Sequence, residues 1–173
     1  MLTMTAPDRS EFADYYSTYI NQVPAGDIKE ILETQGDDYI ALLSGIAESR
    51  SLHRYEAGKW SIREVAAHVN DAERVFTYRA LWFARGYDSP LPSFDQDIAI
   101  ATCNADARTL ASHFEEFRAI RAATVALFHS LPDEAWTRTG IASGNQVSVR
   151  ALAYIVCGHS AHHGRIVRER YLQ

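Results

Sequence analysis

Residues 148–166, SVRALAYIVCGHSAHHGRI, determine how this chain is expected to fold. Its apolar side chains recur at alternating intervals of three and four residues, which places them along one face of an α-helix. Ser148 is suited to begin that helix, because its hydroxyl can accept a hydrogen bond from a free backbone N–H group. Two histidines continue the apolar stripe, which consists of Val149, Leu152, Val156, His159, His163 and Ile166. The stretch therefore predicts an amphipathic helix that points two imidazoles into a core.

Three further segments show the same helical period. The first begins at Asp27 and ends near Ser49, and the second begins at the capping box of Ser61 and Glu64 and ends before Gly86. The third is expected to begin at Asp106 as its N-cap and to end at Leu131-Pro132. Because strand-like alternation is scarce, we predict an all-α, four-helix bundle without a substantial sheet.

The remaining segments define the domain boundaries. Residues 27–173 are expected to form the bundle domain, and residues 1–26 an N-terminal extension that packs on it, with a short helix between Asp8 and Ile20. The connection from Gly86 to Ala105 is longer than the two to eight residues that usually join neighbouring helices in bundles. It is predicted to be either a crossover or a lid.

Composition excludes several classes of function. The formal charge of −5 over 173 residues lacks the basic field that nucleic-acid binding requires. No stretch approaches the ~18 consecutive apolar residues of a membrane span. The chain has two cysteines, Cys103 and Cys157, without CxxC spacing, which is typical of a reducing compartment. We expect a cytoplasmic protein that acts on a small molecule.

The histidines are the candidate site. His159 and His163 are four residues apart, so their Cβ atoms lie about 6 Å from each other on one helix face. His68 lies at a matching depth if its helix runs antiparallel to theirs. Three neutral imidazoles can bind Zn, Ni or Fe(II) and leave coordination positions open. Histidines that merely pack in the core, or complement a helix dipole, are the alternative interpretation.

Two neighbouring residues are further candidates. His162 is an alternate for His163, although it projects about 100° away around the helix. Asp71 follows His68 by about one turn and could orient a ligating imidazole or move a proton, which makes it the candidate catalytic residue. A surface carboxylate is the alternative for Asp71.

Three stretches together resemble the DinB-like superfamily, also described as DinB/YfiT-like metalloenzymes: KWSIREVAAHVNDAERVFTYRALWFARG, SPLPSFDQD and GHSAHHGRIVRERYL. The resemblance runs from about Asp27 to Leu172. It implies a four-helix bundle, commonly dimeric, in which His68, His159 and His163 bind one divalent metal. It also implies a link to enzymes that use a low-molecular-weight thiol such as mycothiol, bacillithiol or glutathione.

These observations lead to three hypotheses. The first is a divalent-metal-dependent enzyme that activates a low-molecular-weight thiol for transfer to a small electrophile, with Zn or Ni as the expected metal and Fe or Mn as alternatives. The second is a non-catalytic, homodimeric bundle in which a metal only stabilises the fold. The third is a metal-dependent hydrolase. The sequence does not identify the substrate.

Overall fold

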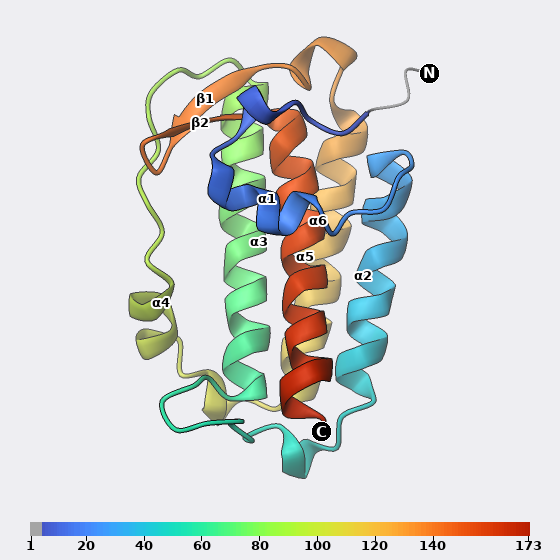
Figure 1. Cartoon of the computed structure of the whole chain (residues 1–173), viewed down its shortest axis with the longest axis vertical. Helices are drawn as coiled ribbons and strands as arrows, with labels where there is room; N and C mark the ends of the chain where they lie inside the picture. The colour runs from blue at the N-terminus through green and yellow to red at the C-terminus, as the bar shows by residue number, and fades with distance from the viewer. Residues whose placement is uncertain (1–4) are drawn as a thin grey trace.

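Four long helices form a bundle in the computed structural model, which describes residues 5–173 (Figure 1). They are α2 (Ile28–Ser44), α3 (Ile62–Ala84), α5 (Leu110–Ser130) and α6 (Val149–Ile166). Helices α2 and α6 run in one direction, and α3 and α5 run in the other (Figure 1). Both α3 and α2 pack against α5 and α6, so that the consecutive helices α2 and α3 lie diagonally across the bundle. The prediction of an all-α four-helix bundle is confirmed.

Local capping explains where most of these helices begin. The side chain of Asp27 accepts a hydrogen bond from the backbone of Lys29, and Ser148 accepts one from Ala151. At the start of α3, Ser61 and Glu64 form the complete capping box. These caps satisfy backbone N–H groups that have no partner within the helix, and they confirm three of the four predicted starts.

The predicted start of the third helix was wrong. The α5 helix is capped by Thr109 instead of Asp106, and its side chain accepts a hydrogen bond from the backbone of Ser112. Asp106 lies in a 3₁₀ turn, Ala105–Ala107, where its carboxylate contacts Ser61 and Arg54. Its side chain is therefore engaged in a tertiary contact rather than in capping. The first helix also ends earlier than expected, at Ser44 instead of near Ser49.

The connection after α3 is a crossover. It runs along the outside of α3 and returns the chain to the opposite end of the bundle, where the parallel helix α5 begins (Figure 1). The crossover contains a short helix, α4 (Gln96–Thr102), which was not predicted. A hairpin of β1 (Thr139–Ala142) and β2 (Asn145–Ser148) precedes α6, and Leu91 of the crossover bridges to Ala142.

The N-terminal segment lies across α6. It consists of two 3₁₀ turns, Arg9–Glu11 and Asp14–Tyr16, followed by the single helical turn α1 (Ser17–Ile20). Phe12, Tyr19 and Ile20 are buried in the same apolar cluster as the middle of α6. At the other end of the chain, α6 continues into a π-helical turn, Val167–Tyr171. Within residues 5–173, no helix is both long and apolar enough to cross a membrane.

Candidate metal centre

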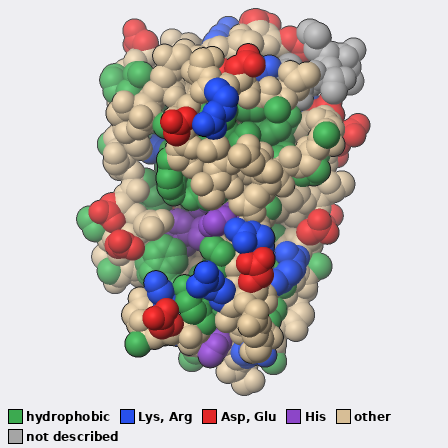
Figure 2. All heavy atoms as spheres, in the orientation of Figure 1, with side chains coloured by type: hydrophobic (Ala, Val, Ile, Leu, Met, Phe, Trp, Pro, Cys, Tyr) green, Lys and Arg blue, Asp and Glu red, His purple; other side chains and the backbone are tan. Residues whose placement is uncertain are grey.

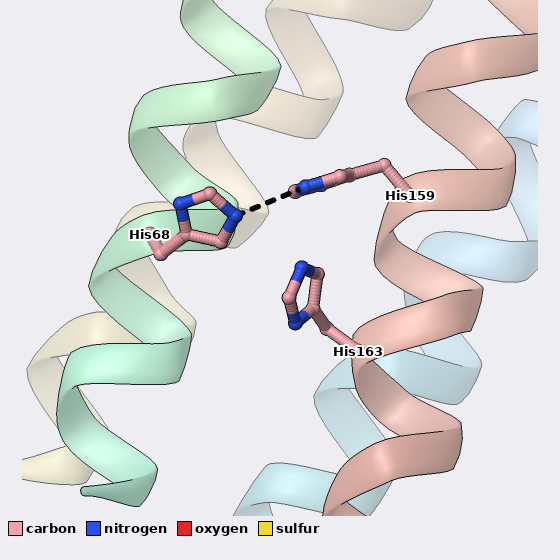
Figure 3. A group of neighbouring side chains, drawn as sticks. All are labelled: His68, His159 and His163. Carbon is pink, nitrogen blue, oxygen red and sulfur yellow. Dashed lines mark hydrogen bonds between the residues drawn. The ribbon is translucent and has the colours of Figure 1, made fainter. Parts of the chain in front are cut away.

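Three imidazoles converge between α3 and α6 (Figure 3). Because the two helices are antiparallel, His68 of α3 faces His159 and His163, which project from successive turns of α6. One ring nitrogen from each residue lies within 4.8 Å of the others, and the Nε2 atoms of His68 and His159 are 3.1 Å apart. The depth match predicted between the two helices therefore brings the three side chains together.

Burial keeps these imidazoles neutral. His68 and His159 are 5% and 4% exposed, and His163 is half-buried. Burial lowers the pKa of His68 to about 4. Burial also lowers the pKa values of His159 and His163 well below the ordinary value, and repulsion from neighbouring histidines lowers them further. Each ring therefore has a free nitrogen lone pair near neutral pH, which is the form that binds a metal.

The donor set fits a divalent cation. Among residues 5–173, the only hydrogen bond recorded for the three rings is the contact between His68 and His159, and the buried Nδ1 of His68 has no partner. A buried polar nitrogen without a partner is costly unless a ligand satisfies it. Three imidazoles complete fewer than the four positions of a tetrahedral site, so they match the open type of centre found in metalloenzymes.

The alternate ligand, His162, points elsewhere. Its Nδ1 lies 3.1 Å from the side-chain nitrogen of Gln22, and its ring makes an edge contact with Tyr19. His163, instead, lies with its ring centroid 4.8 Å from that of His68. The geometry therefore favours His163 over His162 as the third candidate ligand.

Asp71 lies one turn after His68 on α3, and its charged neighbours lie towards α5. Its carboxylate is 3.7 Å from Arg74, and its other charged neighbours are Glu116, Arg108 and His113, in or next to α5. Burial raises the pKa of Asp71 above its ordinary value, and Arg74 counteracts part of this rise. No contact with His68 supports the predicted orienting or catalytic role, which stays a prediction.

A cavity of about 240 Å³ opens beside the three histidines. His68 and His159 form part of its wall, and Figure 2 shows histidine side chains at a hollow in the middle of this face of the molecule. The N-terminal segment contributes Tyr15, Tyr16 and Tyr19 to the wall, and the crossover contributes Phe94. A second cavity, of about 180 Å³, reaches His163 from another side, between Trp60 and Tyr171. The candidate centre is therefore accessible from two directions.

The family model of the DinB superfamily matches residues 31–167, which span most of the chain. The chain belongs to the DinB superfamily. Its match includes all three histidines of the candidate centre. No curated protein sequence matches the chain.

Solved structures resemble this DinB-superfamily chain in fold at low sequence identity. YfiT from Bacillus subtilis, described as a probable metal-dependent hydrolase with an unusual four-helix bundle topology, is 16% identical with a TM-score of 0.74, covering 94% of this chain and 89% of its own. A mycothiol-dependent maleylpyruvate isomerase is 14% identical with a TM-score of 0.69. That match covers 84% of this chain and 61% of the isomerase. At these identities the likeness establishes the fold.

Two features of this DinB-superfamily site were missed in the sequence. Gly158 allows α1 to approach α6, because a Cβ there would lie 2.1 Å from the backbone oxygen of Tyr19. A glycine inside a helical pattern is a signal of close approach, and it precedes His159 directly. Arg79 also lines the cavity, and its position on α3 gave no local indication of this. Cys157, next to Gly158, is buried, and burial raises the pKa of its thiol to about 12.

Proposed function

We propose that this DinB-superfamily protein is a divalent-metal-dependent enzyme that activates a low-molecular-weight thiol for transfer to a small electrophile. His68, His159 and His163 would hold the metal, with Zn or Ni as the preferred ion and Fe or Mn as alternatives. The observation that carries the proposal is the convergence of three neutral imidazoles beside two cavities, where the only hydrogen bond of their rings within residues 5–173 is the one between His68 and His159.

The metal would supply one chemical effect, which is to lower the pKa of a thiol so that the thiolate forms near neutral pH. The chain supplies the surroundings. Aromatic side chains of the N-terminal segment and Phe76 of α3 cover the histidines and exclude water from the reacting atoms; the ring centroids of Tyr19 and Phe76 lie 5.1 and 5.7 Å from that of His159. Two cavities reach different histidines, an arrangement that supports a reaction between two bound molecules.

Tyr19 is suited to donate a hydrogen bond at this site. Burial raises the pKa of its hydroxyl, and a hydrogen bond of 2.7 Å with the hydroxyl of Tyr15 raises it further. The phenol therefore stays protonated over the range of pH in which the protein would act. We propose that it helps to orient a polar group of the substrate in the cavity that it lines.

Metal content tests the proposal. The purified protein is expected to contain about one equivalent of metal by elemental analysis, and His68→Ala is expected to weaken metal binding by at least about 100-fold, since even the loss of an outer-sphere partner costs 10- to 100-fold. His162→Ala is the matched control, because it removes a neighbouring imidazole that points to Gln22 and should retain the metal. Wild-type protein without metal, or unchanged metal content and stability in His68→Ala, would refute the metal centre.

Activity assays with and without thiol separate the candidate reactions. Turnover of small electrophiles that depends on mycothiol, bacillithiol or glutathione supports thiol transfer. Thiol-independent hydrolysis would instead support the second candidate, a metal-dependent hydrolase, which the overall similarity to YfiT favours. If removing the metal with a chelator unfolds the protein and no turnover is found, the metal has a structural role.

We also propose that the protein is a cytoplasmic homodimer. Exposed apolar side chains on the outside of α3 and α4 support self-association: Tyr78 is 50% exposed and Ile98 is 66% exposed. Sedimentation velocity at several concentrations tests the oligomeric state, and a monomer at all concentrations would contradict the proposal.

A further inference from the structure

Arg79 is a buried cation without a carboxylate partner. It is 4% exposed, yet none of the carboxylates in residues 5–173 lies within 4.0 Å of its guanidinium. Arg121, which is similarly buried, instead forms two hydrogen bonds of 2.8 Å with Glu73. The hydrogen-bond partners of Arg79 are neutral oxygens: the carbonyl of Pro92 at 2.9 Å, the hydroxyl of Ser143 at 3.0 Å and the hydroxyl of Tyr16. An unpaired buried charge is costly, which points to a role other than stability.

Part of the Arg79 guanidinium remains available to bind a ligand. The hydrogen bonds to Pro92 and Ser143 both use one nitrogen, Nη2, so the other nitrogens of the guanidinium face only the Tyr16 hydroxyl among the partners given above. The side chain lines the cavity beside the histidines, and no Asp or Glu lines this cavity with it. The Arg79 cation also lowers the pKa of Tyr16 against the larger rise caused by burial, consistent with a phenol close to it. The planar fork of an arginine matches the two oxygens of a carboxylate.

Arg79 and the histidines are within reach of one small molecule. Both His159 and Arg79 lie beside the Phe76 ring, whose centroid is 5.7 Å from the centroid of His159 and 5.9 Å from Cζ of Arg79. The imidazole and the guanidinium are therefore separated by no more than these two distances together. A cavity of about 240 Å³ is below the range of roughly 300–1,000 Å³ that is usual for drug-sized ligands. It suits a short acid better than a tripeptide-sized thiol.

We infer that Arg79 is the carboxylate-binding residue of the substrate pocket, and that the electrophile of the proposed reaction is a small carboxylic acid whose reacting atom faces the histidines. This inference rests on the proposed function for the identity of the reaction, but the binding of the carboxylate depends on Arg79 alone. Arg79 is a substrate-positioning residue in this arrangement, because its charge selects the anionic end of the molecule and its place on α3 sets the molecule's direction.

Calorimetric titration with two matched probes tests the inference. Crotonate and crotonamide have nearly the same shape and differ in charge, so crotonate should bind to the wild-type protein and crotonamide should bind at least about tenfold more weakly. Arg79→Met is expected to weaken crotonate binding by about tenfold or more, and Arg79→Lys, which keeps the charge but loses the fork, to have an intermediate effect. Equal binding of the two probes, or unchanged binding in Arg79→Met, would overturn the inference.

Arg74→Met is the control variant. Arg74 lies on the same helix, but it is half exposed and pairs with Glu116 at 2.7 Å, so its loss should leave crotonate binding unchanged. Arg79→Met should be at least as stable as the wild type, because it removes an unpaired buried charge. If that variant does not fold, Arg79→Lys and the comparison of the two probes on the wild-type protein still decide the outcome.

Two further arms of the experiment distinguish other sources of the anion. Glutathione also has carboxylates, and weaker glutathione binding in Arg79→Met with unchanged crotonate binding would overturn the assignment to the electrophile. Inorganic phosphate that binds more tightly than crotonate would overturn the choice of a carboxylate. Repeating the crotonate titration after chelator treatment separates this inference from the metal centre: binding through Arg79 should persist without metal, whereas metal content should be unchanged in Arg79→Met.

Discussion

Replacing Gly158 with alanine is expected to displace the N-terminal wall of the candidate site and leave the three histidines in place. A Cβ at this position would lie 2.1 Å from the carbonyl oxygen of Tyr19 and 2.5 Å from its carbonyl carbon. Non-bonded carbon atoms pack at about 3.5–4.0 Å, so one of the two segments must move by about 1 Å or more. The shift should fall on α1, because α6 is held on its other faces by α2 and α3.

The expected loss of stability in Gly158→Ala follows from two opposing contributions. Overpacking costs about 1–3 kcal/mol, and the upper end applies because the clash is with backbone atoms. Alanine in a helix is favoured over glycine by about 1 kcal/mol, which leaves a net loss of about 2 kcal/mol. Undocking the segment would expose Phe12, Tyr19 and Ile20, each worth about 1.5–3 kcal/mol when buried. Because undocking costs more than the strain, the segment should shift and stay docked.

Urea denaturation and hydrogen exchange measure the two effects. Gly158→Ala should lower the urea midpoint with an unchanged slope, and amides of residues 13–20 should exchange faster. Gly164→Ala is the matched control: it also lies in α6 beside a histidine, but its Cβ would meet only side-chain atoms, those of Tyr39, Leu42 and Arg168 at 3.4–3.7 Å. Because these contacts are with side chains at ordinary van der Waals distances, that variant should be stabilised by up to about 1 kcal/mol. Equal stability of the two variants, or unchanged exchange in residues 13–20, would refute the reasoning.

Other predictions concern charges away from the histidines. Arg121→Met should lower the free energy of unfolding by about 3–5 kcal/mol because it leaves Glu73 buried without a partner, and the double variant with Glu73→Met should recover most of the loss in urea denaturation; a double variant as unstable as the single one would contradict this. Burial tends to raise the pKa of Glu11, but its hydrogen bonds, chiefly from Arg150, hold the pKa below the ordinary 4.5. The ionised Glu11 therefore adds stability that is complete above about pH 4.5 and disappears as the pH falls through the lowered pKa. Glu11→Gln should cost about 1–2 kcal/mol at pH 7 and progressively less as the pH falls below about 4.5, and a deficit that stays the same at acid pH would count against the ion pair. Asp71→Asn should leave metal content unchanged in elemental analysis, since the charged neighbours of this carboxylate lie towards α5; loss of the metal would show that Asp71 supports the site after all.

The starts of three helices could be predicted because capping is local. Asp27, Ser61 and Ser148 each bond to a backbone N–H group two or three residues ahead, so the sequence contains both partners. Asp106 has the same residue type at a plausible position, but its carboxylate contacts Arg54, which is 52 residues away. A tertiary contact of this kind has no local signature.

The candidate metal ligands also differ in whether local sequence alone could predict them. The spacing of His159 and His163 on one helix face follows from the helical repeat alone. The participation of His68 required the orientation of α3 relative to α6, which the histidine pattern and the family resemblance anticipated. The preference for His163 over His162 as a ligand stays a prediction; in the fold, Gln22 engages the ring of His162. The sequence also indicated Asp71 as a candidate catalytic residue. In the fold, most of its charged neighbours are side chains in or next to α5.

The sequence by itself determined the helical period and most of the caps, since these depend on residues within a turn or two of each other, and its motifs indicated the family. Only the tertiary structure decided that α2 and α3 lie diagonally, that the N-terminal segment crosses α6 at Gly158, and that Arg79 faces a cavity without a counter-ion. These features arise from contacts between segments far apart in the chain, which exist only when the four helices have packed and excluded water from the spaces between them.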